Sequence, residues 1–344
     1  MANFDTDYWP KILQYAIEEG ASDIHLSPQQ AVFFRIQGEL QPVNQWVPEE
    51  PDIQQIFYQI TNAKQQTWYQ QNHDLDFAWT YASQRFRMNA FCQRGLLSLA
   101  IRVIPMQIPS LTALGMPPLL PRLLDTQHGL ILITGRTGAG KSTTMASFID
   151  AVNQRRAAHI ITLEDPIEYI HMSGKSLIHQ REYNADFFSF STALRSALRE
   201  DPDIIVVGEL RDKETIAAAL NAAETGHLVL GSLHTQSAAE TVLRLESFFP
   251  AEQQGQIRAQ LAIVLSAIFA QQLVPALNGG RVCAVEAMAA SPAIRNLIRT
   301  GNVQQMKSSM MAGSRVGMQT MEQSMDTLAR LHKISSDTAQ RYCR

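Results

Sequence analysis

The chain contains little cysteine and lacks a long apolar run. Its three cysteines, Cys92, Cys283 and Cys343, lie far apart and form no C-x-x-C pair. This spacing argues against a disulfide framework or a structural zinc site, and it favours a reducing compartment. The longest apolar stretch, 261–270, is too short to cross a bilayer, which takes about 20 residues. We therefore expect no direct membrane span, and we expect this stretch to form a buried core helix.

The chain also lacks an excess of charge of one sign. Its formal net charge is −3, from 29 basic and 32 acidic residues. No global field therefore draws it to nucleic acid or anionic lipid, and we expect no nucleic-acid partner. The first residues carry charge and proline where a secretory signal needs an apolar run. With 344 residues, of which 45% are apolar, we expect a cytoplasmic globular protein of two domains.

A cluster of prolines separates the two predicted domains. Five prolines fall within 105–121. Proline lacks an amide donor and restricts both its own backbone and that of its neighbour. We therefore predict a linker over 106–122, between a small N-terminal domain, 1–105, and a C-terminal domain, 123–344.

The N-terminal segment has the pattern of a small α/β domain. Residues 11–19 have helical spacing, 31–36 are apolar and branched, and 83–91 and 96–104 resemble strands with Gly95 at the turn between them. Such a domain can be a folding platform and nothing more. Arg85, Arg87, Arg94 and Arg102 argue against that reading, because two of them lie within strand-like apolar runs and must find a partner.

Beyond the linker, short apolar strands alternate with helical segments. This alternation implies a mostly parallel sheet with ligands at the carboxyl ends of its strands. The pattern becomes helical beyond about residue 250. The predicted strands are 129–134, 159–163, 204–207 and 228–233, and the predicted helices include 192–199 and 213–224.

Residues 135–142 match the complete phosphate-loop pattern G-x-x-x-x-G-K-[ST]. They follow the predicted strand 130–134 and open a predicted helix, 143–153, which is the context this motif requires. Glycines let backbone N–H groups curl around a phosphate chain, and the helix N-terminus adds positive potential. Lys141 is expected to neutralise the β- and γ-phosphates, and Ser142 to bind Mg²⁺. The predicted nucleotide-binding residues are Gly135, Arg136, Thr137, Gly138, Ala139, Gly140, Lys141, Ser142 and Thr143.

Acidic residues end two of the predicted strands. Glu209 follows the strand 204–207, which lies beside the phosphate loop in a P-loop fold, and is the candidate for polarising the attacking water. The alternative is a solvated edge residue. Glu164 opens a run of three acids in five residues, which repel one another unless they share a cation or a donor. We predict that Glu164 and Glu209 face Mg²⁺ through water, and the alternative for 164–168 is a solvated acidic turn.

A histidine stands at each end of the strand 228–233. His234 leaves the sheet on the phosphate side and is a candidate hydrogen-bond donor to phosphate. Either histidine alone is more often structural, and His227 lies at the opposite strand end, which disfavours a shared metal. The chain has no N/T-K-x-D segment, the pattern that GTPases use for guanine, and this favours ATP.

Taken together, these segments resemble the motor ATPases of secretion systems and type IV pili. Within that superfamily they are most similar to the pilus retraction family (PilT/PilU-like), and the likeness covers nearly the whole chain. It rests on ASDIHL at 21–26, the phosphate loop, the Asp box at 162–168, the Walker B region at 201–203 and 208–212, the His box at 225–235, AIRNLIR at 293–299 and GMQTM at 317–321.

The resemblance implies a fold and a set of roles. The fold class is α/β, with a RecA-like P-loop C-terminal domain and a smaller, PAS-like α/β N-terminal domain. In the family, the residue in the place of Glu209 activates water, that in the place of Glu164 supports Mg²⁺ and the attacking water, and that in the place of His234 approaches the γ-phosphate. Arg87 and Arg102 match the positions of two arginine fingers.

The alternative for these two arginines is a structural pairing with local acids such as Asp74 or Asp76. Two loop positions depart from the family pattern. Arg136 occupies a position where the family usually has proline, and Ala139 one where it usually has serine. Both positions are variable, so nucleotide binding is not affected. The segment 306–314 matches the retraction type poorly, which leaves a PilU-like accessory motor open.

The resemblance also implies partners and a location. It implies a homohexamer that hydrolyses ATP with Mg²⁺, works against an inner-membrane pilus platform protein at the cytoplasmic side of that membrane, and has a paralogous motor ATPase as a further partner. Its action would be pilus retraction, which supports twitching motility. An elongation or secretion motor resembles a longer chain, often with a four-cysteine zinc insertion. A P-loop kinase needs a lid and an acceptor site, and a nucleic-acid motor needs a basic face; the sequence indicates none of these.

Overall fold

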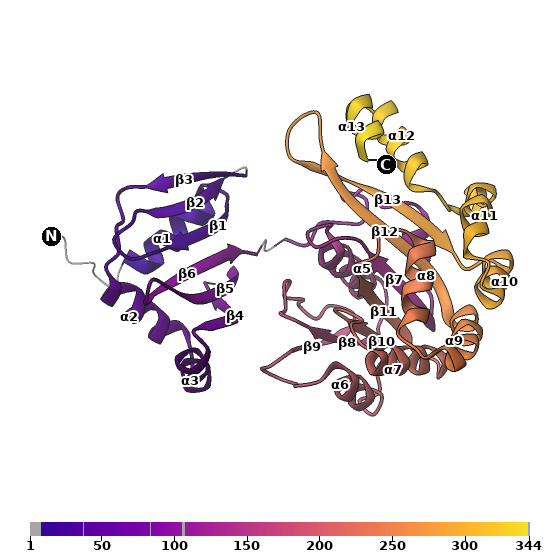
Figure 1. The fold of residues 1–344 in the computed structure, drawn as a ribbon, viewed down its shortest axis with the longest axis horizontal. Coiled ribbons are helices and arrows are strands. Elements are labelled where there is room, and N and C mark those ends of the chain that lie inside the picture. Colours follow the sequence, from indigo (N-terminus) through magenta and orange to yellow (C-terminus); the bar gives the residue numbers. More distant parts are fainter. Residues whose placement is uncertain (1–7, 37, 83, 105–106, 343–344) are drawn as a thin grey trace. The chain divides into compact units, whose positions relative to one another are not determined.

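The computed structural model describes residues 8–36, 38–82, 84–104 and 107–342. It divides the chain into two compact units (Figure 1). The first comprises Met1–Gln107 with Glu168–Ile170, and the second Ile108–Ile167 with His171–Arg344. Most of the predicted linker, 106–122, therefore lies in the second unit, and Leu111, Leu119 and Leu120 are buried in that unit's core.

The first unit is an antiparallel sheet of six strands in the spatial order β3-β2-β1-β6-β5-β4. Trp9, Ile12, Leu13 and Ala16 recur at helical spacing in α1 and are buried, as expected for an amphipathic helix that covers a sheet. The elements are α1 (Tyr8–Glu18), β1 (Ala21–Leu26), β2 (Val32–Ile36), β3 (Glu39–Val43), α2 (Glu50–Ile60), α3 (Ala63–Asn72), β4 (Asp74–Tyr81), β5 (Gln84–Gln93) and β6 (Leu96–Val103).

One face of this sheet is apolar and the other is polar. On β5, Phe86 and Met88 are buried, whereas Arg87 between them is partly exposed, because successive side chains of a strand point to opposite faces. On β6, Ile101 is buried and Arg102 is exposed. The predicted hairpin of 83–91 and 96–104 is confirmed over its described residues. It places both arginines on the polar face.

The second unit is a sheet of seven strands in the order β13-β12-β7-β11-β10-β8-β9. All of its neighbouring pairs are parallel except β12 with β13. Its strands are β7 (Gly129–Thr134), β8 (His159–Glu164), β9 (Leu177–Glu182), β10 (Ile204–Val207), β11 (Leu228–Leu233), β12 (Leu265–Pro275) and β13 (Arg281–Ala289). Its helices are α4 (Leu119–Arg122), α5 (Lys141–Arg155), α6 (Phe190–Ala197), α7 (Lys213–Glu224), α8 (Ala238–Ser247), α9 (Ala251–Val264), α10 (Pro292–Thr300), α11 (Met306–Ala312), α12 (Met321–Arg330) and α13 (Ser336–Tyr342), with short 3₁₀ turns at Val303–Gln305 and Ser314–Val316.

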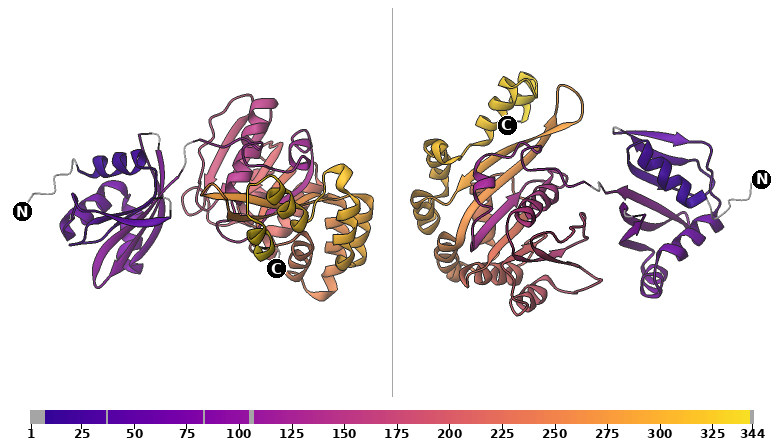
Figure 2. Two further views of the ribbon diagram at one scale, coloured as in Figure 1. Left: turned by 90° about the horizontal axis from the view of Figure 1, so that it is seen from above. Right: turned by 180° about the vertical axis from the view of Figure 1, so that it is seen from behind.

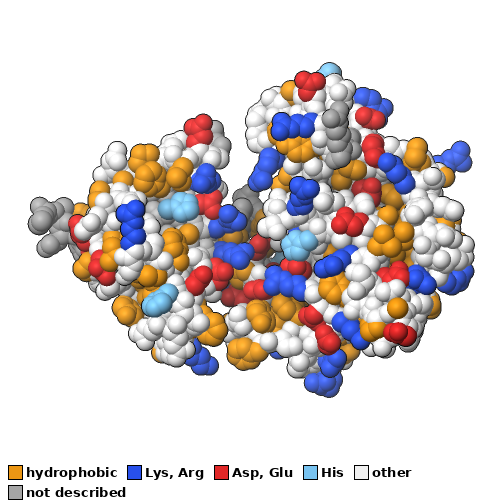
Figure 3. All heavy atoms as spheres, viewed as in Figure 1, with side chains coloured by type: hydrophobic (Ala, Val, Ile, Leu, Met, Phe, Trp, Pro, Cys, Tyr) orange, Lys and Arg blue, Asp and Glu red, His pale blue; other side chains and the backbone are white. Residues whose placement is uncertain are grey.

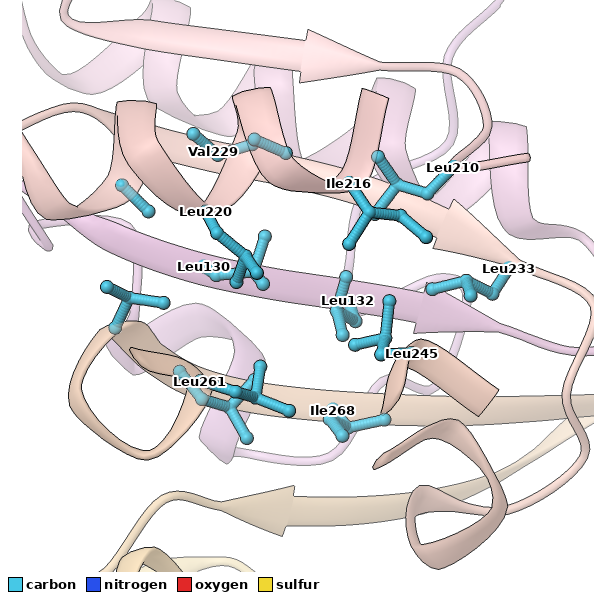
Figure 4. Packing of buried hydrophobic residues seen from close by; sticks show 14 of the residues in the cluster. Leu130, Leu132, Leu210, Ile216, Leu220, Val229, Leu233, Leu245, Leu261 and Ile268 are labelled. Atoms are coloured by element: carbon cyan, nitrogen blue, oxygen red, sulfur yellow. The ribbon is translucent and has the colours of Figure 1, made fainter. Parts of the chain in front are cut away.

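Helices cover both faces of the seven-stranded sheet (Figures 1 and 2). Along β7, Leu130 and Leu132 pack into the cluster beneath α7, α8 and α9 (Figure 4), whereas Ile131 and Ile133 pack into the cluster beneath α5. Because both faces are buried, polar chemistry is confined to the strand ends. On the face of each unit drawn in Figure 3, basic and acidic side chains are interspersed, in keeping with a net charge of −3.

The prediction that the chain is helical beyond residue 250 is confirmed for 251–264 and for most of the described residues from 292 on, but it was wrong for 265–289. The strands β12 and β13 form a long antiparallel hairpin there, and helices resume only at α10. The apolar stretch 261–270, predicted to be a core helix, is the end of α9 followed by the first half of β12. A strand buried on both faces is a continuous apolar run without a period, so pattern alone does not separate it from a buried helix.

Among the described residues, Cys92 and Cys283 are free thiols, and Cys343 lies outside them. Burial raises the pKa of the Cys283 thiol to about 12. No helix within the described ranges is long and apolar enough to cross a membrane.

Candidate active site

The loop between β7 and α5 has a backbone that only glycine permits. A Cβ on Gly135 would lie 2.4 Å from the carbonyl oxygen of Gln271 and 2.9 Å from Cβ of Ala139. Gly138 and Gly140 have φ angles of +78° and +87°, in the left-handed region, and a Cβ on either would meet nothing within 4 Å. The loop therefore encloses an open cradle of backbone at the N-terminus of α5, which is where a phosphate chain binds in P-loop folds.

Lys141, the first residue of α5, lies across this loop. Its Nζ donates to the carbonyl oxygens of Gly135 at 2.8 Å and Arg136 at 3.2 Å. Ser142 and Thr143 follow in the first turn and are partly exposed, and Thr137 and Gly138 are exposed at the tip of the loop. The ammonium, the backbone donors and the hydroxyls suit phosphate oxygens and a Mg²⁺ ion, so the residues present fit both groups.

The segment that carries Glu209 is fixed by its neighbour Leu210. Leu210 is buried in the core beneath α7 (Figure 4). Its backbone N–H donates to the carbonyl of Ser232 at 2.9 Å. A Cβ on Gly231 would lie 2.9 Å from Cδ1 of Leu210, so the glycine makes room for this anchor. Glu209 and Arg211, on either side of Leu210, are held at the carboxyl edge of the sheet.

A chain of polar contacts runs along this edge. His234 Nε2 lies 2.8 Å from Glu209 Oε1, and His234 Nδ1 lies 3.5 Å from Lys141 Nζ. Arg211 Nε lies 2.9 Å from Glu209 Oε2, and Arg211 Nη1 donates to Asp165 Oδ2 at 3.2 Å. Since Nε2 of His234 faces a carboxylate, we assign its proton to Nε2, which leaves Nδ1 to accept from Lys141. These contacts join the ends of β7, β11, β10 and β8.

Arg211 lies between two acids, Glu209 and Asp165, in this series of polar contacts. Burial lowers the pKa of its guanidinium, but the hydrogen bonds and charges of Glu209 and Asp165 outweigh burial and raise the pKa overall. The Glu209 side chain is only 19% exposed, and both of its oxygens are engaged. The carboxylate is therefore held in one orientation.

Glu164, at the end of β8, is oriented by neutral donors. Its Oε1 accepts from Thr162 Oγ1 at 2.6 Å and from Gln180 Nε2 at 3.0 Å. Oε1 of Gln180 in turn accepts the backbone N–H of His171 at 2.8 Å, which fixes the amide. Glu164 and its neighbour Asp165 thus have different partners.

The two predicted arginine fingers lie opposite each other in the first unit. The sheet register pairs Arg87 with Arg102, Arg102 with Asp23, and Asp23 with Arg35. Nε of Arg102 lies 3.0 Å from Oδ1 of Asp23, and Nε of Arg35 lies 3.9 Å from Oδ2 of the same carboxylate. One row across four strands therefore carries three guanidinium groups and one carboxylate.

The acids named as alternative partners for these arginines have another contact. Asp74 and Asp76 accept from the amide of Asn89, at 2.8 Å and 3.2 Å. Arg102 does pair with an acid of its own unit, but that acid is Asp23.

Of the site residues predicted from the sequence, the structure brings Lys141, Glu209 and His234 into one cluster. Glu164 joins the same sheet edge next to Asp165, and Arg87 and Arg102 belong to the first unit. Sequence reasoning missed Arg211 and Gln180. Arg211 had a signal, because a basic residue two positions after a strand-end acid is placed to pair with it. Gln180 had none, because only the pairing of β8 with β9 brings it to Glu164.

Comparisons with known proteins agree with this architecture. The family model of type II/IV secretion system proteins matches residues 6–342. The chain is similar to the type IV pilus retraction ATPase PilT of Pseudomonas aeruginosa, with 44% identity over 330 residues and 96% of each chain covered. It is also similar to the type IV pilus ATPase PilU of that organism, with 37% identity over 331 residues, 96% of this chain and 87% of the relative. A crystal structure of the pilus retraction motor PilT with bound ADP gives a TM-score of 0.90 at 44% identity and covers 96% of this chain and 95% of that one.

Proposed function

Because the chain belongs to the type II/IV secretion system protein family and is an ATPase of the pilus retraction type, we propose that it is the motor whose ATP hydrolysis retracts a type IV pilus. Retraction is supported by the similarity to PilT, and the observation that carries ATP hydrolysis is the contact of His234 with both Lys141 of the phosphate loop and Glu209. One side chain thereby connects phosphate binding to the candidate base.

In the proposed mechanism the phosphate loop binds the triphosphate. The backbone N–H groups of the loop and the first turn of α5 donate to phosphate oxygens, and Lys141 places its ammonium beside the β- and γ-phosphates. The hydroxyl of Ser142 would hold Mg²⁺, with Glu164 and Glu209 facing it through water. When bound, Mg²⁺ supplies positive charge that neutralises the phosphate oxygens. ATP itself is the substrate.

Glu209 is the proposed base. A carboxylate at the strand end accepts a proton from the water that attacks the γ-phosphate. Arg211 and His234 hold this carboxylate in one orientation, and Gln180 with Thr162 does the same for Glu164. A fixed orientation matters because the base must lie within hydrogen-bond reach of the water it activates.

Arg87 and Arg102 are the proposed arginine fingers. Their row of the sheet carries three guanidinium groups against the single carboxylate of Asp23, so it has positive charge in excess. These guanidinium groups belong to a unit that lacks the phosphate loop. They can stabilise the transferring phosphoryl group only when the domains or neighbouring subunits are arranged so that the arginines reach it. This dependence is how hydrolysis would be coupled to domain motion.

We further propose a homohexameric ring that acts on an inner-membrane platform protein at the cytoplasmic side of that membrane, with a paralogous motor ATPase as a second partner. A PilU-like accessory motor is the second candidate function. The departure of 306–314 from the retraction pattern favours it, whereas the higher identity to PilT favours the main proposal.

Deletion of the gene tests this function through the number of surface pili and twitching motility. A retraction motor predicts more pili and loss of twitching, restored by the wild-type gene or by a Glu224→Gln gene but not by Glu209→Gln. Glu224 is the matched control because it is an exposed acid at the far end of α7. Fewer pili would indicate an assembly motor. Unchanged pili and motility would indicate an accessory one.

A further inference from the structure

Glu286, on β13, is a buried acid outside the site described above. Its side chain lies among core elements of the second unit, and the residue is 8% exposed. Oε1 accepts the backbone N–H of Ala238 at 2.7 Å, and the backbone N–H of Met321 donates to the same carboxylate. Burying a carboxylate is costly unless hydrogen bonds or charges compensate it. The two backbone donors supply that compensation.

Both donors are the first N–H groups of helices. Ala238 begins α8 after the N-cap Ser237, and Met321 begins α12 after the N-cap Thr320. Each cap side chain accepts from the third residue of its helix and leaves the first N–H unsatisfied. Glu286 satisfies both. Burial raises the pKa of this carboxyl group, and the two backbone hydrogen bonds, at the positive ends of two helix dipoles, oppose that shift.

The α8 end of this contact leads directly to the active site. Thr235 Oγ1 lies 2.7 Å from Thr241 Oγ1, and the backbone N–H of Gln236 donates to Glu240 Oε2 at 2.7 Å. The residues between His234 and α8 are therefore tied to the first turn of α8. The position of that turn therefore determines the position of the His234 side chain.

The α12 end holds the GMQTM motif, to which the proposed function gives no role. The backbones of Gln319 and Ala287 exchange two hydrogen bonds, of 2.9 Å and 3.0 Å, and the Gln319 amide donates to the carbonyl of Val285 at 2.7 Å. These contacts attach the start of α12 to β13 on both sides of Glu286. Lys307 of α11 pairs with Glu322 in the first turn of α12 at 2.6 Å.

We infer that Glu286 is a positioning residue for ATP hydrolysis: by joining the N-termini of α8 and α12 it places His234 beside Glu209 and links the nucleotide site to the C-terminal helices. This inference rests on the role of His234 in the proposed function. Coupling of this kind is reciprocal, so nucleotide binding also stabilises the start of α12.

Glu286→Gln tests the link in the full-length protein. The amide leaves a single, uncharged acceptor oxygen for the two backbone N–H groups, so the contact with the two helix ends is weakened. The matched control is Glu246→Gln, which changes a poorly exposed acid at the other end of α8 that pairs with Arg258. Both variants replace a poorly exposed acid by its amide, but only Glu286 contacts the N-terminus of α8, to which the His234 segment is tied.

Steady-state ATP hydrolysis separates positioning from general structure. We expect Glu286→Gln to lower kcat by about 10- to 100-fold with little change in KM, the size of effect that a misplaced catalytic group produces. Glu246→Gln should keep kcat near that of the wild type. In the His234→Ala background, Glu286→Gln should add little further loss. Equal kcat in the two Gln variants, or fully additive losses, would overturn the inference. If His234→Ala hydrolyses ATP normally, the proposed role of His234 fails as well.

A second variant keeps the test valid if Glu286→Gln does not fold. Met321→Pro removes the α12 donor and leaves the α8 donor in place, and proline is tolerated at the first position of a helix. It also replaces a partly buried side chain that packs against Met325 and its neighbours, so Met321→Ala, which keeps the N–H, is its control. Its predecessor, Thr320, already has extended backbone with φ −81° and ψ 165°. Hydrogen exchange of the first turn of α12 should slow in the wild type when a non-hydrolysable ATP analogue with Mg²⁺ binds, and this slowing should vanish in Met321→Pro. A nucleotide-dependent slowing that survives in the variant contradicts the link.

Discussion

Nε2 of His234 lies 2.8 Å from Oε1 of Glu209 at the carboxyl edge of the parallel sheet. The opposite ring nitrogen lies 3.5 Å from Nζ of Lys141, so one imidazole spans the distance between the phosphate loop and the candidate base. A phosphate that draws Lys141 toward itself also changes what the His234 ring can accept. In the proposed mechanism, binding of nucleotide and orientation of the candidate base are therefore linked through a single side chain.

Lys141→Ala should weaken ATP binding strongly. The variant loses the ammonium that lies across the loop, and a charge-assisted contact is worth about 1.5–3 kcal/mol. Titration with a fluorescent ATP analogue measures the loss. Lys175→Ala, which removes an exposed lysine near the start of β9, is the control and should bind as the wild type does. Unchanged affinity in Lys141→Ala would remove 135–142 from the active site.

Glu209→Gln should bind ATP but hydrolyse it slowly. The amide keeps the shape and can still accept from His234, but it cannot take a proton from water. Loss of a general base typically lowers turnover by about 10²–10⁴-fold. Parallel assays of binding and phosphate release, with Glu224→Gln as the control, make the comparison. Near-normal turnover would transfer the catalytic role to Glu164.

Arg211→Ala should lower kcat by about tenfold without lowering stability. Arg211 is 56% exposed, and ion pairs of such groups contribute only about 0–1 kcal/mol, so the melting temperature should hold. Release of the Glu209 carboxylate from its fixed orientation is what slows the reaction. The control is Arg195→Ala, an exposed arginine of α6. A fall in melting temperature as large as the fall in kcat would show that Arg211 is merely structural.

Arg87→Ala and Arg102→Ala should each lower turnover steeply and affinity only modestly. The negative charge they meet is greatest in the transition state, and an arginine finger is worth about 10³–10⁵ in turnover. Arg102 is 64% exposed, so losing its pair with Asp23 should leave the melting temperature of the full-length protein unchanged. Arg35→Ala, in the same row of the sheet, is the matched control.

Mixing of variants decides whether this contact crosses subunits. If Arg87→Ala chains restore activity to Glu209→Gln chains, sites have been completed by residues from two chains. Absence of recovery in well-mixed assemblies would mean that each chain completes its own site. Wild-type turnover in both arginine variants would contradict their role altogether.

His171 should make the protein less stable as the pH falls. Burial lowers the pKa of its imidazole from the ordinary 6.5 to about 4. Between these values the unfolded chain binds a proton that the folded chain does not, so the free energy of unfolding is highest above pH 6.5 and falls as the pH drops toward 4. Urea unfolding from pH 4 to 8 should show a flatter profile for His171→Asn than for the wild type. The exposed His332→Asn should keep the wild-type slope, and an unchanged slope in His171→Asn would contradict the assignment.

Much of the nucleotide site could be read from short segments. The phosphate loop is contiguous, and the strands 204–207 and 228–233 have their predicted bounds because helical segments flank each short buried run. These features depend on backbone preferences and on periods within a few residues of one another, which a single sequence displays. The hairpin of β12 and β13 was missed for the converse reason, since an apolar run buried on both faces has no period.

The partners of the proposed catalytic groups were decided by the tertiary structure alone. Gln180 reaches Glu164 because β9 pairs with β8, Asp23 meets Arg102 because β1 pairs with β6, and Glu286 receives two helix ends that lie 48 and 35 positions from it in the chain. The sequence predicts the residues that we propose to carry the chemistry, because their types follow from what phosphate and water require. It does not name the residues that orient them, because strand register and helix docking bring those together across long stretches of chain, and no local pattern records that register.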